Sequence, residues 1–328
     1  MTARDPLPVA GYQGPTYYDQ PPVKASSYGA LVWGYTWLAG LAGSAQVIAT
    51  AADLLGRSSL RSVVRQGRSL AAWLPMVGAG LLVADLHTPQ RFYNMLRIFR
   101  STSPMSIGTY VLSAFSVSSM VTALAGKTGH RGLAKAAQVP AAAAGAGMSV
   151  YTGALLGATS TPLWSAEPAL LTGRFAASAF ATGAAVLSIG ETLRGHRGNA
   201  AALQRVGAIA ALVEHGFAHA AETRWREHGF GKTLYEPQIS AGRQASTQLG
   251  VWLPLACLAI NELGTRRSRS LTVVGAVGLL AGGLAMRAMV FQAGNRSAQR
   301  PRDGFALTSS PPATAQQRQR RMPMGSAP

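Results

Sequence analysis

The sequence predicts an all-helical, polytopic membrane protein with eight transmembrane helices arranged as two four-helix bundles. Only 13% of its 328 residues are charged while 48% are hydrophobic, whereas soluble domains carry about 25% charged residues. The apolar residues gather in blocks that approach the roughly 20 residues a helix needs to cross a bilayer. Because lipid offers no hydrogen bonds to an open backbone, such blocks are expected to be helices.

We identify eight apolar blocks in chain order: Tyr28–Leu55, Leu70–Leu86, Met105–Leu124, Val139–Ala158, Ala169–Ile189, Ala200–Ala221, Ser246–Asn261 and Leu271–Ala293. The second and seventh are short and contain Pro75 and Pro254, so they carry the weakest signal.

The blocks divide the chain into a polar segment 1–27, a transmembrane domain 28–293 and a basic tail 294–328, which we expect to be disordered. Within the domain, residues 28–158 are expected to form a first bundle and residues 169–293 a second bundle. Segment 1–27 lacks a basic start followed by an apolar core, so the first helix is expected to act as the insertion signal.

Charge and cysteine usage exclude several classes of function. The formal net charge of +18 comes from basic residues scattered over loops and the tail, without a nucleic-acid motif, which favours contact with a lipid surface over nucleic acid. The single cysteine, Cys257, cannot form an internal disulfide, hold an iron–sulfur cluster or attach a c-type haem.

An even number of crossings predicts both termini on one side of the membrane. The loops 56–69, 125–138, 190–199 and 262–270 then share the other side, and each is basic, whereas loop 159–168 has no Lys or Arg. The positive-inside rule predicts that the basic loops face the cytoplasm of a bacterial inner membrane and that both termini lie outside.

Small residues are expected to let helix backbones approach closely, which is how helices pack in lipid. Gly40 and Gly43 lie in the first block, and Gly145 and Gly147 lie in the fourth.

Polar residues within the blocks are predicted to gather in one leaflet. At 1.5 Å of rise per residue, Tyr35 lies about 10 Å into its helix from the terminus side. Four further residues lie about 18 to 24 Å along helices that finish on that side. They are Asp85, Tyr151, Glu214 and Arg287. A cluster confined to one leaflet suits a ligand site that opens to lipid or to one surface, not a pore.

The chemistry of this cluster indicates a lipid-soluble quinone. Tyrosine hydroxyls can donate to a carbonyl oxygen, and nearby carboxylates can exchange the two protons that accompany two-electron reduction. No redox-metal ligands are recognisable, so this chain is expected to hold no haem or iron–sulfur cluster and to receive its electrons from a partner.

Three stretches resemble the NrfD/PsrC family, the polysulfide reductase membrane subunits. The first is Asp85-Leu-His-Thr-Pro-Gln-Arg-Phe-Tyr-Asn-Met-Leu, followed by Ser103-Pro-Met-Ser. The second is Tyr151-Thr-Gly-Ala-Leu-Leu with Pro162-Leu-Trp, and the third is Trp37-Leu-Ala-Gly-Leu-Ala-Gly. The resemblance covers about residues 28–190 and is loose from the sixth helix onward.

The resemblance implies a membrane anchor that is not itself catalytic on a substrate. Such an anchor exchanges electrons between menaquinone or ubiquinone and a four-cluster, ferredoxin-like iron–sulfur subunit, which serves a catalytic subunit of the molybdopterin type. The family's quinone-binding tyrosine falls on Tyr151. The alternative, structural interpretation is a tyrosine that packs in a Gly-rich helix with its hydroxyl bonded to a neighbour. Some members use an Asn and a His where this chain has Val32 and Tyr35. The partner is expected to dock beside the N-terminus and loop 87–104.

Each candidate has a functional and a structural interpretation. Asp85 and Arg91 transfer protons or form an ion pair that fixes the loop to the helix end. Tyr35 binds the quinone or belongs to an interfacial aromatic belt. Glu214 is expected to relay protons, and Arg287, placed near a helix end, is expected to snorkel to the interface.

Histidines add few alternatives. His87 joins the site and its proton route or contacts the backbone at the start of the loop. His215 and His219 share one helix face at a spacing that can chelate zinc, but one face cannot supply a bis-His haem. Polar lining of the helix end is the preferred interpretation, so no metal site is assigned.

Three other functions compete with the quinone-linked anchor. A secondary transporter would place polar sites at the midplane of broken helices. A haem b anchor would show a Soret band. A purely structural anchor would keep the fold without quinone chemistry.

Overall fold

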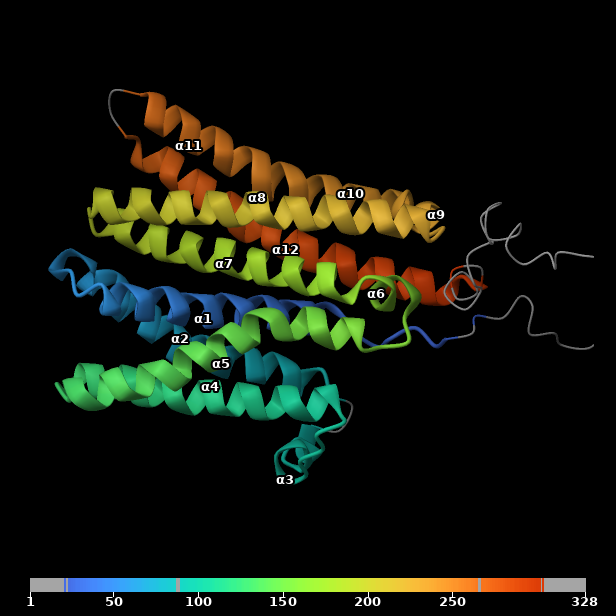
Figure 1. The fold of residues 1–328 in the computed structure, drawn as a ribbon, viewed down its shortest axis with the longest axis horizontal. Coiled ribbons are helices and arrows are strands. Elements are labelled where there is room, and N and C mark those ends of the chain that lie inside the picture. Colours follow the sequence, from blue (N-terminus) through green and yellow to red (C-terminus); the bar gives the residue numbers. More distant parts are fainter. Residues whose placement is uncertain (1–20, 22, 87–88, 265–266, 302, 304–328) are drawn as a thin grey trace, which may run out of the picture.

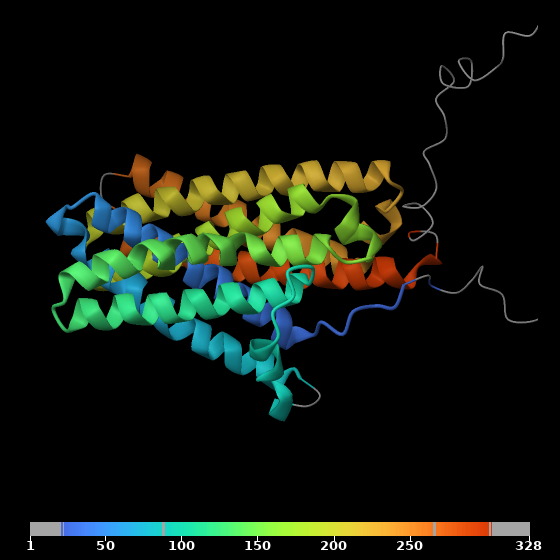
Figure 2. The same cartoon turned by 60° about the horizontal axis from the view of Figure 1, so that its bottom comes forward.

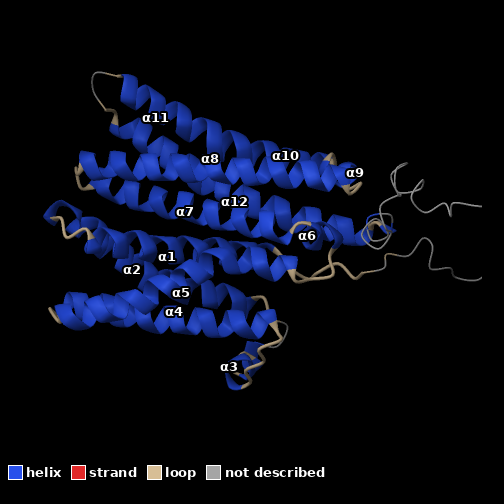
Figure 3. Cartoon of the chain, viewed as in Figure 1, coloured by secondary structure: helices blue, strands red, loops and turns tan. Residues whose placement is uncertain are grey.

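The structure, a computed structural model, describes residues 21, 23–86, 89–264, 267–301 and 303. Its described part is helical and contains no strand (Figure 3). The elements are α1 (Ala30–Leu54), η2 (Ser58–Leu60), α2 (Arg61–Ala84), η3 (Pro89–Arg91), α3 (Asn94–Arg97), α4 (Pro104–Lys127), α5 (Arg131–Gly157), α6 (Pro162–Ala166), α7 (Pro168–Leu193), α8 (Arg197–Glu227), α9 (Gly231–Leu234), α10 (Pro237–Thr247), η4 (Gln248–Trp252), α11 (Leu253–Leu263) and α12 (Arg269–Gln299).

Every predicted apolar block falls on helix, and among the described residues five helical segments are long and apolar enough to cross a membrane. These are Ser58–Ala84, Pro104–Lys127, Arg131–Gly157, Pro168–Leu193 and Arg269–Gln299. The all-helical class and the multi-pass membrane character are therefore confirmed.

The long helices lie side by side along one axis (Figure 1). α1, α2, α4 and α5 pack on one another, as do α7, α8, α12 and the rod formed by α10, η4 and α11. α1 and α5 join the two groups through α7, and α1 also contacts α12. The short helices α3, α6 and α9 lie at the end where the chain enters α1 and leaves α12, called here the terminus end (Figures 1 and 2).

The opposite end, called here the hairpin end, carries the turns that join α1 to α2, α4 to α5, α7 to α8 and α11 to α12 (Figure 1). Gly56, Gly129 and Gly195 turn the first three at positive φ of 67°, 84° and 82°. Glycine adopts this left-handed conformation without steric cost, which is how many helices end. Two of these turns repeat one motif, Gly-His-Arg-Gly, at 129–132 and 195–198.

Helix boundaries extend beyond the apolar blocks. α2 begins at Arg61 and α5 at Arg131, so much of the segments predicted as loops 56–69 and 125–138 is helical. Apolar patterning marks only the part of a helix that faces lipid, and basic first turns continue the same helix outside it. The two prolines in the short blocks are also accommodated: Pro75 lies inside α2, and Pro254 follows the π-helical turn η4.

α12 also ends later than predicted, at Gln299 rather than 293. Two polar contacts hold this extra length against the protein. Asn295 Oδ1 accepts hydrogen bonds from the Ser26 backbone N–H and hydroxyl at 3.1 and 2.6 Å, and the Ser297 hydroxyl accepts one from the Leu163 N–H at 3.2 Å. Residues 304–328 of the predicted tail, and most of segment 1–27, lie outside the described residues.

Aromatic side chains form the centre of the largest buried cluster. Trp164 of α6 is fully buried, donates from Nε1 to the Val290 carbonyl at 2.9 Å, and packs against Tyr28 and Phe291. This contact attaches the start of α1 and the end of α12 to the connection between the two helix groups.

Glycines hold α1 and α5 at the close approach predicted from the sequence. A Cβ on Gly43 would overlap the Gly145 carbonyl oxygen, and a Cβ on Gly145 would lie 2.7 Å from the Gly43 carbonyl oxygen. Both distances are too short for a side chain, so the two backbones are in direct contact.

We predict that Gly43→Ala destabilises the protein by about 1–3 kcal/mol, because the added methyl group must separate α1 from α5. Thermal unfolding in detergent measures the change. Gly80→Ala in α2 is the matched control, since nothing lies within 4 Å of its added Cβ. It should be neutral or slightly stabilising. Equal midpoints for the two variants would contradict the close-contact explanation.

Candidate functional site

Tyr35 lies inside the first helix group. It belongs to the second turn of α1, and 7% of its surface is exposed. Its ring faces Gly78 of α2, where an added Cβ would lie 3.2 Å from the ring. Leu81, Leu82 and Val111 pack around the same cluster. Tyr35 is therefore an interior side chain and not part of an interfacial belt.

Tyr151 lies at the terminus end of α5 and reaches across to α4. Its hydroxyl donates a hydrogen bond to the Pro104 carbonyl at 3.1 Å, and its ring occupies the space above Gly108 that a Cβ would fill. Met148, which lies one helical turn before Tyr151 on α5, belongs to the same buried cluster as Tyr35. The two predicted tyrosines thus share one region of the first helix group.

A hollow of about 380 Å³ adjoins this region on the outer side of α4 and α5. Its lining is mostly apolar and includes Phe99, Tyr110 and Gly147. Because Gly147 lies one helical turn from Tyr151 on the same face of α5, the hollow approaches the tyrosine from the lipid side. Its volume falls within the range of ligand pockets, about 300–1,000 Å³.

Asp85 caps the end of α2 and is half buried beside the start of α1. Its Oδ1 would lie 3.9 Å from a Cβ on Gly29, the residue that precedes the first turn of α1. An anion placed there interacts favourably with the positive end of a helix. His87 lies outside the described residues, and Arg91 ends η3 with a side chain outside the described part. Pairing of Asp85 with Arg91 remains a prediction.

Glu214 lies in the second helix group and is paired with a charge that the sequence interpretation missed. Its Oε1 accepts a hydrogen bond from Arg174 Nε at 2.7 Å, and the two side chains are 10% and 2% exposed. Arg174 comes from α7 and Glu214 from α8. The sequence did contain an indication of this pair. Arg174 is a charged residue inside the fifth apolar block, where ionised groups are costly and need a partner.

Arg287 does not snorkel, and this expectation was wrong. Its side chain is 1% exposed, donates to the Ser178 hydroxyl at 3.1 Å and to the Gly283 carbonyl at 3.0 Å, and lies over the ring of Phe175. The expectation assumed a helix that ends near residue 293. Because α12 continues to Gln299, Arg287 lies more than three turns from its end and turns inward.

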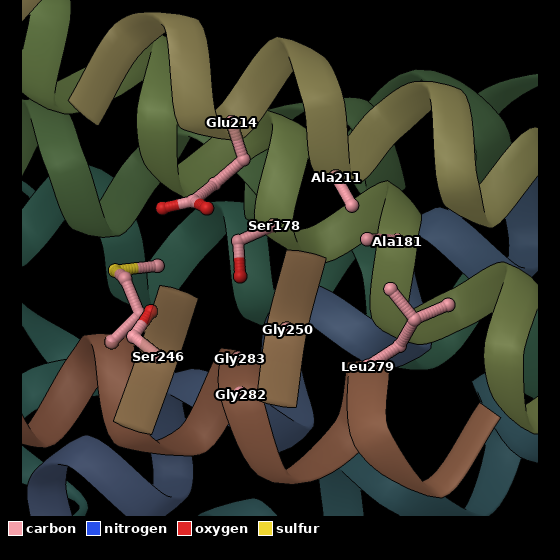
Figure 4. Close-up of a pocket in the computed structure, with 10 residues that line it drawn as sticks. Ser178, Ala181, Ala211, Glu214, Ser246, Gly250, Leu279, Gly282 and Gly283 are labelled. Atoms are coloured by element: carbon pink, nitrogen blue, oxygen red, sulfur yellow. The ribbon is translucent and has the colours of Figure 1, made fainter. Parts of the chain in front are cut away.

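Glu214 and Ser178 face a small enclosed space between α7, α8 and α12 (Figure 4). Ser246 of α10 and Gly250 of η4 line it from the other side. The volume is about 10 Å³, close to the minimum for one water molecule. This space suits a bound water next to a carboxylate, not an organic ligand.

The contacts thus divide the predicted residues into two sets. The tyrosines pack among α1, α2, α4 and α5, whereas Glu214 pairs with Arg174 between α7 and α8. α1 connects the sets, since a Cβ on Gly40 would lie 3.0 Å from Arg287 Nη2. These contacts do not bring all the predicted residues together around one quinone headgroup.

His215 and His219 line a separate hollow of about 300 Å³ between α8 and α10. Glu222 in its wall accepts a hydrogen bond from Arg243 at 3.0 Å and lies 3.5 Å from Arg226. Within the described ranges, no three His, Cys, Asp or Glu side chains are grouped so as to hold a metal ion.

Comparison with known proteins gives one family. The family model described as "Polysulphide reductase, NrfD" matches residues 20–217, which is well over half of the chain. No individual curated protein matches the sequence. The matched range contains Tyr35, Asp85, Tyr151, Arg174 and Glu214.

We predict that Arg174→Met destabilises the protein by about 3–5 kcal/mol, because it leaves the Glu214 carboxylate buried without its partner. The double variant Arg174→Met/Glu214→Leu should recover most of that loss. Thermal unfolding of the purified protein measures both effects.

The exposed pair Arg205–Glu262, at 2.9 Å, provides the control. Arg205→Met should change the unfolding midpoint little, since Arg267, which pairs with Glu262 at 3.0 Å, and water still stabilise the exposed carboxylate. A double variant at 174 and 214 that is no more stable than Arg174→Met would show that the pair does not act as a unit.

Proposed function

Because the chain belongs to the polysulphide reductase NrfD family, whose members are membrane subunits of oxidoreductase complexes, we propose that it exchanges electrons and protons between the quinone pool and a peripheral iron–sulfur subunit. The iron–sulfur subunit in turn serves a catalytic subunit, of the molybdopterin type in this proposal. The chain itself supplies the quinone site and the membrane attachment.

The proposal includes eight membrane crossings. Besides the five apolar segments, α1, α8 and the rod α10–η4–α11 run alongside them through the fold (Figure 1). α1 has 25 residues and α8 has 31, and both exceed the roughly 20 needed to cross a bilayer. More than half of α1 is buried against other helices. A helix covered by protein needs less apolar surface than one that faces lipid.

The orientation follows from the charges at the two ends. The hairpin end carries the basic turns, including Arg57, Arg131 and Arg197. We place it in the cytoplasm and both termini outside, as the positive-inside rule requires.

The quinone assignment depends most on the position of the Tyr151 hydroxyl. Its hydroxyl lies at the α4–α5 contact next to an apolar hollow and donates to a single backbone carbonyl, that of Pro104. A quinone carbonyl entering from lipid can accept the same hydrogen bond, while the apolar wall accommodates its tail. Tyr35 offers a second hydroxyl from α1.

Proton exchange accompanies the electron transfer, since a quinone gains two electrons and two protons when it becomes a quinol. Asp85 lies at the terminus end, next to α1, and is the carboxylate placed to exchange protons with that surface. His87 and Arg91 belong to the same segment and are assigned to the same route. Glu214 is assigned to proton transfer in the second helix group, where Arg174 stabilises its charged form.

The partner is proposed to dock at the terminus end, over the segment that contains α3. Phe92, Tyr93, Ile98 and Phe99 are exposed there, at 45–59% of their surface. This position brings the iron–sulfur subunit to the end of the protein that holds both tyrosines, so the electron path to the quinone is short.

We predict that Tyr151→Phe lowers quinone-linked turnover of the intact complex by about tenfold, the effect of losing one hydrogen bond that forms to the reacting quinone. Assembly with the iron–sulfur subunit and activity with an artificial electron carrier should persist. Steady-state kinetics with a soluble quinone analogue measures the change.

Tyr110→Phe is the matched control. Its hydroxyl also donates to a backbone carbonyl, that of Leu96 at 2.9 Å, on the other side of the hollow. It should leave turnover near the wild-type value. If Tyr151→Phe is fully active and responds to quinone-site inhibitors like the wild type, the site assignment fails and a purely structural anchor becomes the better description.

A further inference from the structure

Two adjoining hollows lie at the hairpin end, between α2 and the α7–α8 turn. The outer one has a volume of about 470 Å³ and the inner one about 420 Å³. Ser62 and Arg65 line both, so the two hollows meet at these residues, and together they are called here the recess. The tyrosines and the Arg174–Glu214 pair do not take part in it.

The outer hollow is rich in positive charge. Arg61, Arg65 and Arg197 line it and are exposed. No carboxylate of the described residues lies within 4 Å of these three guanidinium groups. Ser58 and Ser59 add hydroxyl groups beside them. Arginines and hydroxyls without an internal anion are the groups that bind phosphate.

A buried carboxylate that does not itself line this hollow links several residues that do. Glu191 is fully buried and accepts hydrogen bonds from the Ser62 hydroxyl at 2.6 Å and from Asn199 Nδ2 at 2.8 Å. His196 Nδ1 lies 3.0 Å from the same oxygen, and Asn199 also donates to the Ser59 carbonyl at 2.7 Å. These bonds fix the start of α2 to the α7–α8 turn, so the arginines are held around a preformed recess.

The lining of the inner hollow changes from polar to apolar along α2. Ser62, Arg65, Gln66 and Ser69 line its first part, together with Arg194 of the α7–α8 turn, and Leu70, Trp73 and Leu74 line it farther along the helix. Trp73 is 57% exposed and lies about 12 Å farther along α2 than Arg65. The recess therefore passes from cationic to apolar as it runs from the hairpin end toward the middle of the membrane, which matches the order of headgroup and acyl chain in a phospholipid.

We propose that this recess binds an anionic phospholipid from the leaflet at the hairpin end. The phosphate contacts Arg61, Arg65 and Arg197, and an acyl chain lies along Leu70, Trp73 and Leu74. The lipid covers the junction between α2 of the first helix group and α7–α8 of the second, and so ties the two groups together. The proposal does not depend on quinone chemistry.

Lipid that stays bound during purification provides the first test. Wild type and the double variant Arg65→Gln/Arg197→Gln are extracted from membranes, exchanged into detergent and analysed by native mass spectrometry. We expect the amount of retained phosphatidylglycerol or diphosphatidylglycerol to fall at least tenfold in the variant, because each lost arginine contact lowers the affinity for the lipid about fivefold. Phosphatidylethanolamine should be unchanged.

The repeated turn supplies a control with the same loss of charge. Arg131 occupies in the α4–α5 turn the place that Arg197 has in the α7–α8 turn, and it lies outside the recess. The double variant Lys127→Gln/Arg131→Gln should retain wild-type amounts of anionic lipid. Equal losses in both double variants would reduce the proposal to a general attraction between a basic surface and an anionic membrane, and would overturn it.

Trp73 reports the acyl chain independently. The substitution Trp73→Phe removes one part of the tryptophan fluorescence, and this part is the emission of Trp73. In nanodiscs, brominated phosphatidylglycerol should quench the Trp73 emission more strongly than brominated phosphatidylcholine does. Arg65→Gln should abolish that preference. Equal quenching by the two lipids in the wild type would overturn the proposal. Displacement of the bound lipid by 10–50 mM inorganic phosphate, a concentration range on the order of weak anion binding, would instead identify a site for free phosphate.

Discussion

The position of α1 between two helix groups is the constraint on which the rest of the structure depends. α1 contacts α2 and α5 on one side and α7 and α12 on the other. It can do so because small residues line it: Gly43 touches the backbone of α5 at Gly145, and Gly40 lies against Ala179 of α7 and Arg287 of α12. In lipid, where apolar side chains gain little by leaving the solvent, such close contact is what holds helices together. Tyr35 extends from the same helix into the first group, so the packing of α1 also positions that hydroxyl.

Buried charged side chains make hydrogen bonds in both halves of the fold. In the terminus half, Arg174 pairs with Glu214, and Nη1 of Arg287 donates to Ser178 and to a backbone carbonyl, while its Nε is buried without a partner. At the hairpin end, Glu191 is contacted by Ser62 of α2, by Asn199 of α8 and by His196 of the turn that precedes α8. A buried ion pair contributes little net stability, because removing two charges from water offsets their attraction. Its consequence is specificity: the pair between α7 and α8 favours one register of these two helices over sliding alternatives.

The sequence was sufficient for the helices, their alternating direction and the end at which the basic turns lie, because each of these follows from the length and spacing of apolar blocks. It also predicted that glycines of the first and fourth blocks permit close approach of helices, although not that Gly43 and Gly145 contact each other. It was not sufficient for what depends on three-dimensional partners. The start of α2 at Arg61 and the end of α12 at Gln299 lie in polar sequence, and the latter rests on bonds from Asn295 and Ser297 to distant segments. Arg287 was misplaced for the same reason, and the separation of Glu214 from the tyrosines follows from which helices are neighbours, which hydropathy does not encode.

That separation has a mechanistic consequence. A quinone bound by Tyr151 would exchange protons locally, through groups at the terminus end such as Asp85, without requiring the carboxylate of Glu214. Glu214 would then act on the quinone only across the contacts between the two helix groups. In these contacts Gly40 of α1 lies against Arg287 of α12, and α5 packs on α7. Any coupling between chemistry in the first helix group and proton movement in the second must therefore pass through the packing of α1, α2 and α5 against the helices of the second group, the same contacts that hold the two groups together.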